Sequence, residues 1–235
     1  VLFFVGKLDT FEPSKEILEG LQQLLGDMID TAEGNYGGMT RQITVDDKGL
    51  AAIFVFGLPG FMHFSPASQC LLAAQRMLST IRGRAQGVDL RAGVATGWCY
   101  CGLVGDPATR CEYSVMGDAV NTAARLAGKA FLLGQPLLCT AAVAASIPDQ
   151  MQGSVKLRHV GSVVLKGKSS PMDVCTTELQ QLSFRPSMPH LRDSLTARAD
   201  EVCSALSFAF GGCGGGRKSD ARILLVEGQG GIGKT

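Results

Sequence analysis

The sequence has almost no excess of charge of either sign. Its 235 residues include 22 Lys and Arg against 21 Asp and Glu, which gives a formal net charge of +1. A nearly neutral chain has no strong overall attraction to nucleic acid or to an anionic membrane surface. Composition therefore gives no case for either partner, and we expect no nucleic-acid binding.

Residue spacings typical of a zinc site are also missing. None of the eight Cys stands in a Cys-x-x-Cys pair and the chain has only three His, so we expect no zinc site. Most of the cysteines stand in apolar runs, which predicts small, reduced core residues and suits the cytosol. The eight are Cys70, Cys99, Cys101, Cys111, Cys139, Cys175, Cys203 and Cys213.

Long hydrophobic runs are absent as well. The nearest candidate, residues 130–147, is interrupted by Gly134-Gln135-Pro136 and is too short to span a bilayer. No signal peptide is recognisable, so we expect a cytoplasmic protein without a transmembrane segment. Hydrophobic residues still make up 46% of the chain, which is enough for one large domain, or one domain and a fragment of another.

Hydrophobic periodicity predicts an α+β fold. The expected elements begin with a strand at 1–5, a helix capped by Ser14, strands at 39–45 and 50–56 joined by a turn at 46–49, a helix from Ser65, and strands at 88–96 and 98–104 paired as a hairpin around Gly97. This order is typical of a ferredoxin-like βαββαβ core. Extra C-terminal elements follow: a helix at 119–130, a strand at 136–139, a short helix to 147, and strands at 155–165 and 172–177.

One stretch combines a strand, a glycine turn and a helix with chemically useful side chains. Residues 113–115 favour extended backbone, Gly117 interrupts the run, and Asp118 can cap the helix that follows. Asn121 and Arg125 stand four residues apart and share one face of that helix. An amide and a cationic fork at this spacing match a ribose oxygen and a phosphate oxygen. Taken alone, the pair fits an ordinary surface helix with a solvated Arg better.

The pair does not stand alone. The run from Tyr113 to Leu126 resembles the Tyr-Thr-Val-Ile-Gly-Asp-Ala-Val-Asn-x-Ala-Ala-Arg-Leu signature of the class III nucleotidyl cyclases. Residues 53–60 (Ile-Phe-Val-Phe-Gly-Leu-Pro-Gly) and 102–105 (Gly-Leu-Val-Gly) also look like that family, and the closer resemblance is to the second catalytic half of soluble, bicarbonate-responsive adenylyl cyclases. It covers about residues 1–178 and implies the class III cyclase fold.

The resemblance implies a reaction and roles for several residues. In the family, the ribose 3′-hydroxyl of ATP attacks the α-phosphorus and expels pyrophosphate, with two Mg²⁺ (or Mn²⁺) ions held by two Asp carboxylates. Asn121 would orient the ribose and Arg125 would stabilise the transition-state phosphate. The first-strand Asp position is Val5, which cannot bind a hard cation. Asp46 and Asp47 lie near the second position but are expected as turn residues, so a partner half would mainly hold the metal.

The same resemblance predicts groups that contact the base and the triphosphate. Ser114 takes the position of an Asp or Thr seven residues before Asn121, and its partner from the second strand is Gln42, or Arg41 if the register is shifted by one. Gln42 is neither the Lys of adenylyl cyclases nor the Glu associated with guanine, although its amide can bond a purine edge. It is equally explained as a plain strand residue. Lys166 resembles the Lys that binds the triphosphate, and a solvated lysine at a strand end explains it as well.

The C-terminal residues contain a second motif. A predicted strand at 221–227 runs into a Gly-x-x-x-x-Gly-Lys-Thr phosphate-binding loop, with Gly228, Gly233, Lys234 and Thr235 at its defining positions. Backbone amides of such a loop cradle phosphates, the Lys reaches the outer ones, and the Thr hydroxyl holds Mg²⁺. A glycine-rich tail is the alternative explanation.

The predicted domains are a cyclase catalytic domain of the second-half type at 1–180, a linker and helix at 181–220, and the truncated start of an α/β P-loop domain at 221–235. Because the chain begins on a strand and ends within a motif, we expect it to be a fragment of a longer protein.

Three functions follow from this reading. The leading hypothesis is the second catalytic half of a soluble adenylyl cyclase that uses ATP and depends on a metal-bearing first half in the same longer chain. The runner-up is a degenerate, non-catalytic nucleotide-binding module that regulates an attached P-loop ATPase. A guanylyl cyclase half is a third and weaker hypothesis.

Overall fold

The computed structural model describes residues 1–8, 15–46, 49–59, 64–84, 88–106 and 108–179. The chain divides into two units, Val1–Arg185 and Pro186–Thr235, and all described residues belong to the first. In the part of the chain that the structure describes, no helix combines the length and apolar character needed to cross a membrane. The predicted linker and P-loop segments lie outside the described residues.

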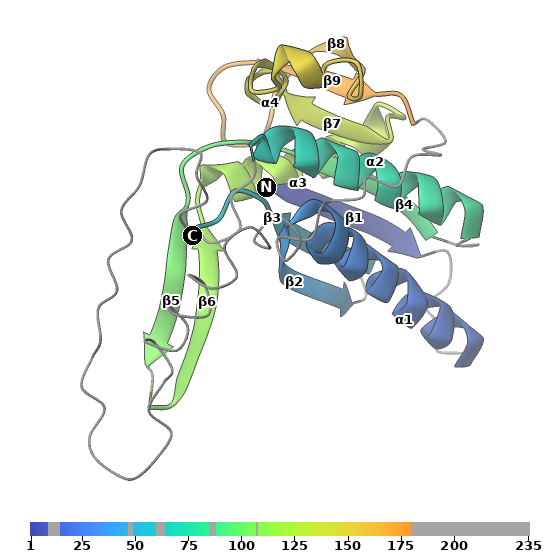
Figure 1. Cartoon of the computed structure of the whole chain (residues 1–235), viewed down its shortest axis with the longest axis vertical. Coiled ribbons are helices and arrows are strands. Elements are labelled where there is room, and N and C mark those ends of the chain that lie inside the picture. The colour runs from blue at the N-terminus through green and yellow to red at the C-terminus, as the bar shows by residue number, and fades with distance from the viewer. Residues whose placement is uncertain (9–14, 47–48, 60–63, 85–87, 107, 180–235) are drawn as a thin grey trace, which may run out of the picture. The chain divides into compact units, whose positions relative to one another are not determined.

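The first half of the described chain forms a four-stranded antiparallel unit with two helices (Figure 1). Its elements are β1 (Leu2–Leu8), α1 (Lys15–Ile29), β2 (Met39–Asp46), β3 (Gly49–Val55), α2 (Pro66–Arg84) and β4 (Val88–Val94), and a π-helical segment, Asp30–Asn35, follows α1. Within the sheet these strands are ordered β2-β3-β1-β4. The predicted ferredoxin-like βαββαβ core is therefore confirmed.

Three further strands widen this sheet. β7 (Leu137–Thr140) pairs in parallel with β4, and β9 (Met172–Thr177) and β8 (Leu157–Val163) follow as antiparallel neighbours, so the order is β2-β3-β1-β4-β7-β9-β8. The helices of this half are α3 (Asp118–Leu132), α4 (Ala141–Ala145) and a short 3₁₀ turn, Asp149–Met151. The predicted closing strands are confirmed as the far edge of the sheet.

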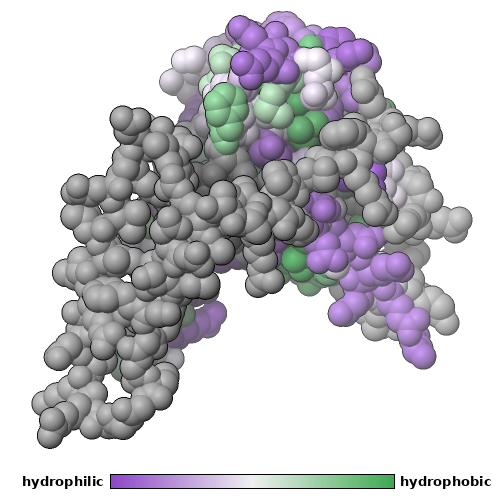
Figure 2. All heavy atoms as spheres, viewed as in Figure 1, coloured by the Kyte–Doolittle hydropathy of each residue, from purple (hydrophilic) through white to green (hydrophobic). Residues whose placement is uncertain are grey.

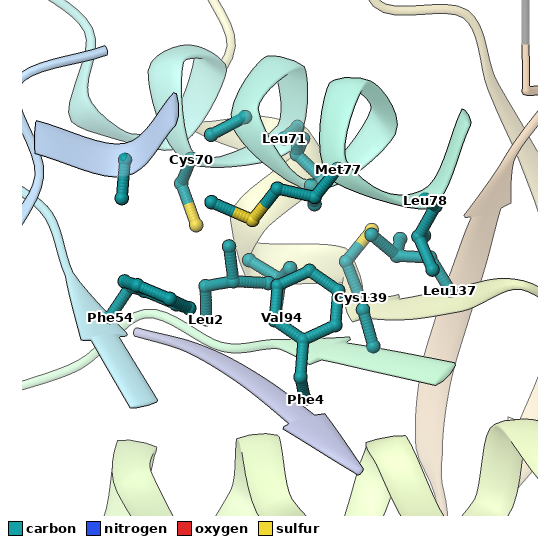
Figure 3. Packing of buried hydrophobic residues seen from close by; sticks show 14 of the residues in the cluster. Leu2, Phe4, Phe54, Cys70, Leu71, Met77, Leu78, Val94, Leu137 and Cys139 are labelled. Atoms are coloured by element: carbon teal, nitrogen blue, oxygen red, sulfur yellow. The ribbon is translucent and has the colours of Figure 1, made fainter. Parts of the chain in front are cut away.

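The main core lies between the sheet and the helices α1 and α2. Leu2 and Phe4 of β1 are fully buried there, and Figure 3 shows Phe4, Val94 and Met77 within the same cluster. α1 is amphipathic: Leu24 and Met28 point into this core, while Figure 2 shows hydrophilic side chains over the exposed side of the helix. α2 begins as predicted, because the Ser65 hydroxyl accepts a hydrogen bond from the Ser68 amide at 3.3 Å.

Several cysteines belong to this core as free thiols. Cys70, Cys139 and Cys175 are buried, whereas Cys111 is exposed. Burial raises the pKa of Cys139 to about 12 and that of Cys70 to about 11. These thiols are protonated at neutral pH and act as packing residues, as predicted for most of the cysteines.

The predicted hairpin around Gly97 is wrong. The strand after Gly97 is β5 (Tyr100–Asp106), and among the described strands it pairs only with β6 (Arg110–Met116), in a separate two-stranded sheet. The reversal lies instead at Asp106, whose carboxylate accepts hydrogen bonds from the Ala108 amide at 2.9 Å and the Thr109 hydroxyl at 3.3 Å. Such an aspartate-closed turn joins β5 to β6 and frees β4 to pair with β7.

We call β5 and β6 together the β5–β6 arm (Figure 1). Large apolar side chains are exposed on the arm and just before it, with relative exposures of 68% for Leu103 on β5 and 99% for Trp98, two residues before β5. Tyr100 and Met116 are also exposed. Apolar groups gathered on one exposed element are typical of a surface that contacts another protein.

Candidate functional site

Helix α3 covers the sheet face opposite α1 and α2, and two glycines place it there. At Gly93 on β4, a side chain would overlap the Ala123 carbonyl, so α3 packs directly on the strand backbone. At Gly117, a Cβ would come within 2.7 Å of the Trp98 carbonyl oxygen. Since β6 ends immediately before Gly117, this close approach delivers the chain from the arm onto the start of α3.

Asn121 and Arg125 lie on α3 as predicted, one turn apart on the same face. Asn121 is exposed and Arg125 is half-buried. Ala119, Ala123 and Leu126 face the sheet and are buried, which orients the neighbouring polar residues away from it. The helix therefore presents an amide and a guanidinium side by side.

Asp118 is not the cap that the sequence predicted. Gly117 occupies the cap position without a side-chain hydrogen bond, and Asp118 is the first residue of α3. Its carboxylate instead accepts hydrogen bonds from the Lys168 ammonium and from the Thr122 hydroxyl, the latter at 3.4 Å. The carboxylate is drawn away from the helix amides because a cation from another element lies beside it.

The Lys168 ammonium holds the pKa of the Asp118 carboxyl below its ordinary value, with smaller contributions from Thr122 and Arg125. Asp118 is thus an anion throughout the neutral range. It places one negative charge beside the cationic groups of this face of α3.

Lys168 belongs to a tight turn that we call the 165–168 turn. The Lys168 amide donates to the Leu165 carbonyl at 3.0 Å, and Gly167 has φ +75°, a conformation that favours glycine. A Cβ at Gly167 would lie 3.6 Å from Nη2 and 3.7 Å from Nη1 of Arg125. The turn therefore lies directly against the Arg125 guanidinium.

The two lysines of this turn differ. Lys166, the predicted triphosphate ligand, is exposed and forms no ion pair among the described residues, whereas Lys168 contacts α3 through Asp118. Sequence reasoning missed both Lys168 and Asp118 as site residues. The signal was present in the Lys-Gly-Lys repeat, but nothing local shows which lysine faces the helix.

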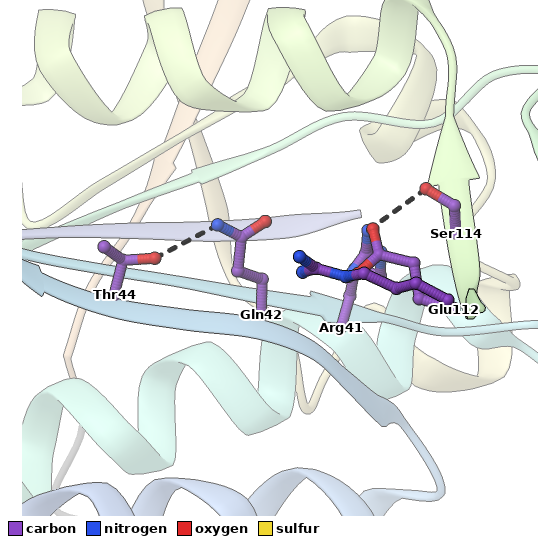
Figure 4. Close-up of polar contacts among 6 residues, drawn as sticks. Arg41, Gln42, Thr44, Glu112 and Ser114 are labelled. Carbon is purple, nitrogen blue, oxygen red and sulfur yellow. Dashed lines mark hydrogen bonds and ion pairs between the residues drawn. The ribbon is translucent and has the colours of Figure 1, made fainter. Parts of the chain in front are cut away.

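Ser114 is buried on β6 and its partner from β2 is Arg41 (Figure 4). Arg41 Nη2 donates to Ser114 Oγ at 3.1 Å and lies 3.4 Å from Glu112 Oε1. A β-bulge between Thr40 and Gln42 makes Arg41 the extra residue of β2. The bulge turns the Arg41 side chain toward β6, which is how bulges commonly re-aim side chains near functional sites.

Gln42 lies on the same strand but contacts a different group. Its amide donates to the Thr44 hydroxyl at 3.0 Å, along β2 itself (Figure 4). Gln42 is opposite Ile53 on β3, and Ile53 is opposite Phe3 on β1, so these three side chains share the sheet face that carries α3. The structure thus brings Arg41 to Ser114 and places Gln42 farther along the same face.

The residues around Val5 do not fit a divalent metal ion. Val5 is opposite Ala51 on β3 and Arg91 on β4, and none of the three has a side-chain oxygen that could bind a hard cation. Asp46 is opposite Gly49 at the end of β2, and Asp47 lies outside the described residues. Among the described residues, no three His, Cys, Asp or Glu side chains are grouped to hold a metal ion.

The predicted phosphate-binding loop lies outside the described residues. Its defining positions are Gly228, Gly233, Lys234 and Thr235.

Comparison with known proteins identifies a family for this chain. The family described as "Adenylate and Guanylate cyclase catalytic domain" matches residues 12–178. Adenylate cyclase 1 of Rhizobium meliloti (strain 1021) is 35% identical over 117 residues, which are 48% of this chain and 17% of that protein. Adenylate cyclase type 10 of Oryctolagus cuniculus is 25% identical over 214 residues, 85% of this chain and 12% of that protein. The chain thus spans less than a fifth of the length of either relative.

Solved structures show the same fold. The adenylyl cyclase CyaB from P. aeruginosa superposes with a TM-score of 0.61 at 21% identity, covering 78% of this chain and 94% of the other. The guanylate cyclase domain of RhGC from Catenaria anguillulae, solved in complex with GTP, gives a TM-score of 0.57 at 18% identity, with 75% and 94% covered. At these identities the likeness establishes the arrangement of the elements.

Proposed function

The chain belongs to the adenylate and guanylate cyclase catalytic domain family, and on this premise we propose that it is the second catalytic half of an adenylyl cyclase, which converts ATP to cyclic AMP and pyrophosphate. The observation that carries this proposal is that Asn121 and Arg125 share one face of α3, with the 165–168 turn lying against the Arg125 guanidinium. Adenylate cyclase 1 of Rhizobium meliloti and adenylate cyclase type 10 of Oryctolagus cuniculus, both similar to this chain, favour ATP as the substrate.

In the proposed reaction, the ribose 3′-oxygen forms a bond to the α-phosphorus while the bond from that phosphorus to the bridging oxygen of pyrophosphate breaks. Arg125 donates hydrogen bonds to the phosphoryl oxygens as negative charge develops there. Asn121, one turn earlier on the helix, holds a ribose oxygen so that the hydroxyl is aligned for attack. Lys166 contacts the outer phosphates from the 165–168 turn.

The metal ions come from the partner half in this proposal, because neither Val5 nor the residues opposite it, Ala51 and Arg91, have a carboxylate. Bound Mg²⁺ or Mn²⁺ would activate the hydroxyl and neutralise phosphate charge. The residues of this chain supply positioning and hydrogen-bond donors.

Two surfaces with exposed apolar side chains are suited to contact a partner domain. Phe3, Val5 and Ile53 are only half-buried on the α3 side of the sheet, so an apolar stripe is open there. Leu103 on the β5–β6 arm and Trp98 just before the arm are also exposed. A second cyclase domain that covers these groups would bury apolar area and complete the site with its carboxylates.

Ser114 and strand β2 form the proposed base-recognition group. Arg41 is the β2 residue in contact with Ser114, and Gln42 is the next polar group on the same strand. Arg41 only donates, whereas Ser114 and Gln42 donate and accept. Ser114 can therefore bond the amino group or a ring nitrogen of adenine, while Gln42 can turn over and pair with either purine.

The place of the chain in a longer protein is also a proposal. The family match ends at residue 178. The alignment with adenylate cyclase type 10 covers 85% of the 235 residues, so it extends past residue 178. We propose a cytoplasmic cyclase in which a P-loop domain follows the second catalytic half, with Lys234 and Thr235 as phosphate and Mg²⁺ ligands; the sequence motif at 228–235 supports the P-loop domain.

The test is to assay the purified chain alone and together with a metal-bearing first half, with ATP and Mg²⁺ or Mn²⁺. We expect no cyclic nucleotide from the chain alone, because a homodimer has Val5 in place of a metal-binding carboxylate in both of its symmetric sites. We expect cyclic AMP from the assembled pair. Cyclic AMP from the isolated chain would contradict the division of labour between the halves.

A second candidate is a non-catalytic nucleotide-binding module that regulates an attached P-loop ATPase. The lack of a carboxylate at Val5 favours this function, since a domain without metal ligands can bind a nucleotide and still not cyclise it. ATP binding without product in the assembled pair, together with a change in ATPase rate on removal of residues 1–178, would support this function over the first.

A further inference from the structure

The ion pair between Asp118 and Lys168 joins two elements that are 50 residues apart in the sequence. We infer that this pair is a latch that positions the Arg125 guanidinium, with Asp118 and Lys168 acting as positioning residues. The kinetic consequence rests on the proposed function, because it assumes that Arg125 contacts the phosphate. The structural consequence, a restrained Arg125 side chain, does not.

The 165–168 turn is held at both ends. At its start, Leu165 is 2% exposed and packs with Leu126 and Ala130 of α3. At its end, the backbone bond from Lys168 to Leu165 closes the turn, and the Lys168 side chain reaches the first residue of α3. The apolar anchor fixes where the turn begins, so the ion pair decides how closely its second half lies on the helix.

The second half of the turn is the part that meets Arg125. Gly167 lies against the guanidinium, close enough that a Cβ there would be in van der Waals contact with both terminal nitrogens. An arginine side chain has several rotatable bonds and loses much of its freedom only where neighbours restrict it. With the latch closed, the Gly167 backbone occupies one side of the guanidinium and limits its orientations.

Asp118 also acts on Arg125 through charge. Asp118, Thr122 and Arg125 share one face of α3, and Arg125 contributes to the low pKa of the Asp118 carboxyl. The Asp118 side chain is 68% exposed and that of Lys168 is 25% exposed. An exposed pair of this kind adds little to global stability, so its main effect is on local geometry.

The kinetic test uses the chain assembled with a metal-bearing first half. We expect Asp118→Asn and Lys168→Met each to lower kcat roughly 10-fold at nearly constant KM. The reason is that a catalytic group displaced by about 1 Å can lower the reaction rate up to about 100-fold. The double variant should be no slower than either single variant, and the exchange Asp118→Lys with Lys168→Asp should recover part of the rate. Lys15→Met removes another exposed ion pair, with Glu19 on α1, and should not change kcat.

The background variant Arg125→Ala gives the decisive comparison. If the latch acts through Arg125, Asp118→Asn and Lys168→Met cause no further loss in that background. Losses that multiply with that of Arg125→Ala would overturn the inference. A raised KM with unchanged kcat would also overturn it, because Lys168 would then be a ligand of the substrate.

A second measurement does not depend on cyclase activity. In the ¹⁵N-labelled chain, the heteronuclear NOE of the Arg125 Nε–H group reports the mobility of the side chain. We expect it to fall in Asp118→Asn and Lys168→Met and to stay at the wild-type value in Lys166→Met, which removes the same charge from the same turn. An unchanged NOE in Asp118→Asn would overturn the latch even if no assembled pair makes cyclic AMP, so failure of the latch and failure of the proposed function are distinguishable.

Discussion

The two faces of strand β1 differ in what covers them. Leu2 and Phe4 point toward α1 and α2 and are fully buried, whereas Phe3 and Val5 point toward the α3 side and are half-buried. The same strand therefore contributes alternately to a closed core and to an open face. The closed face provides stability, and the open face carries the polar groups of α3, β2 and the 165–168 turn.

The helices on the two faces pack in correspondingly different ways. α2 meets the sheet with interlocking large side chains such as Leu71 and Met77. α3 meets it with Ala123 and Ala127 over Gly93, so that helix and strand backbones nearly touch. Small residues bring the α3 backbone close, and this fixes the base from which Asn121 and Arg125 project.

The largest expected effect separates the faces by stability. Phe4→Ala should lower the free energy of unfolding by about 3–5 kcal/mol, since it empties a fully buried site in the main core. Phe3→Ala, the same change one residue earlier on the open face, should cost only about 1–2 kcal/mol. Urea unfolding of both variants measures the difference, and equal losses would mean that the two faces are packed alike.

The second-largest expected effect is on activity and not on stability, and it concerns the open face. In the assembled enzyme, Arg125→Ala should reduce kcat by roughly 100-fold or more with little change in KM, as expected for a donor used mainly in the transition state. Its unfolding free energy should stay close to that of the wild type, because the side chain is not in a hydrophobic core. Near-normal turnover in this variant would contradict the role given to Arg125.

A smaller effect concerns base choice on the open face. We expect the assembled enzyme to prefer ATP, and Arg41→Ala to lower the ratio of ATP to GTP turnover roughly 10-fold by removing a donor beside Ser114.

Gln42→Lys should sharpen the preference for ATP, because Lys only donates whereas Gln pairs with either purine. Assaying both nucleotides on the three proteins tests this, and one common ratio would show that neither side chain contacts the base.

The smallest expected effect is a pH dependence at Asp118. Because Lys168 depresses the folded-state pKa of this carboxyl below 3.8, its stabilising contribution is present above the unfolded pKa and is lost as pH falls through the folded value. The difference in Tm between wild type and Asp118→Asn should therefore be constant from pH 7 to about pH 5 and shrink as the pH falls further, through the ordinary carboxyl range and then the lowered folded-state value. The groups that lower this pKa are Lys168, Thr122 and Arg125. Because Lys168 contributes most, Lys168→Met should greatly weaken the pH dependence.

Local sequence predicted most of the elements and part of the site. The periodic apolar positions of α1 and α2, the Ser65 cap and the succession of strands and helices along residues 1–94 follow from spacing and capping rules, which act over a few residues. The strand, glycine and helix from Tyr113 onward were predicted in the same way. Asn121 and Arg125 share a face because the helical period places residues four apart together.

Tertiary structure decided the contacts between segments far apart in the chain. Arg41 meets Ser114 across 73 residues and Lys168 meets Asp118 across 50, and the carboxylate predicted as a cap became an ion-pair partner. The pairing of β5 with β6, in place of β4, also depends on which strand edge is free in the folded sheet. The sequence by itself determined the elements and the α3 motif, because helix and strand periods are local. A bulge, a strand partner and an ion pair depend on the relative positions of distant segments, which only packing of the whole domain establishes.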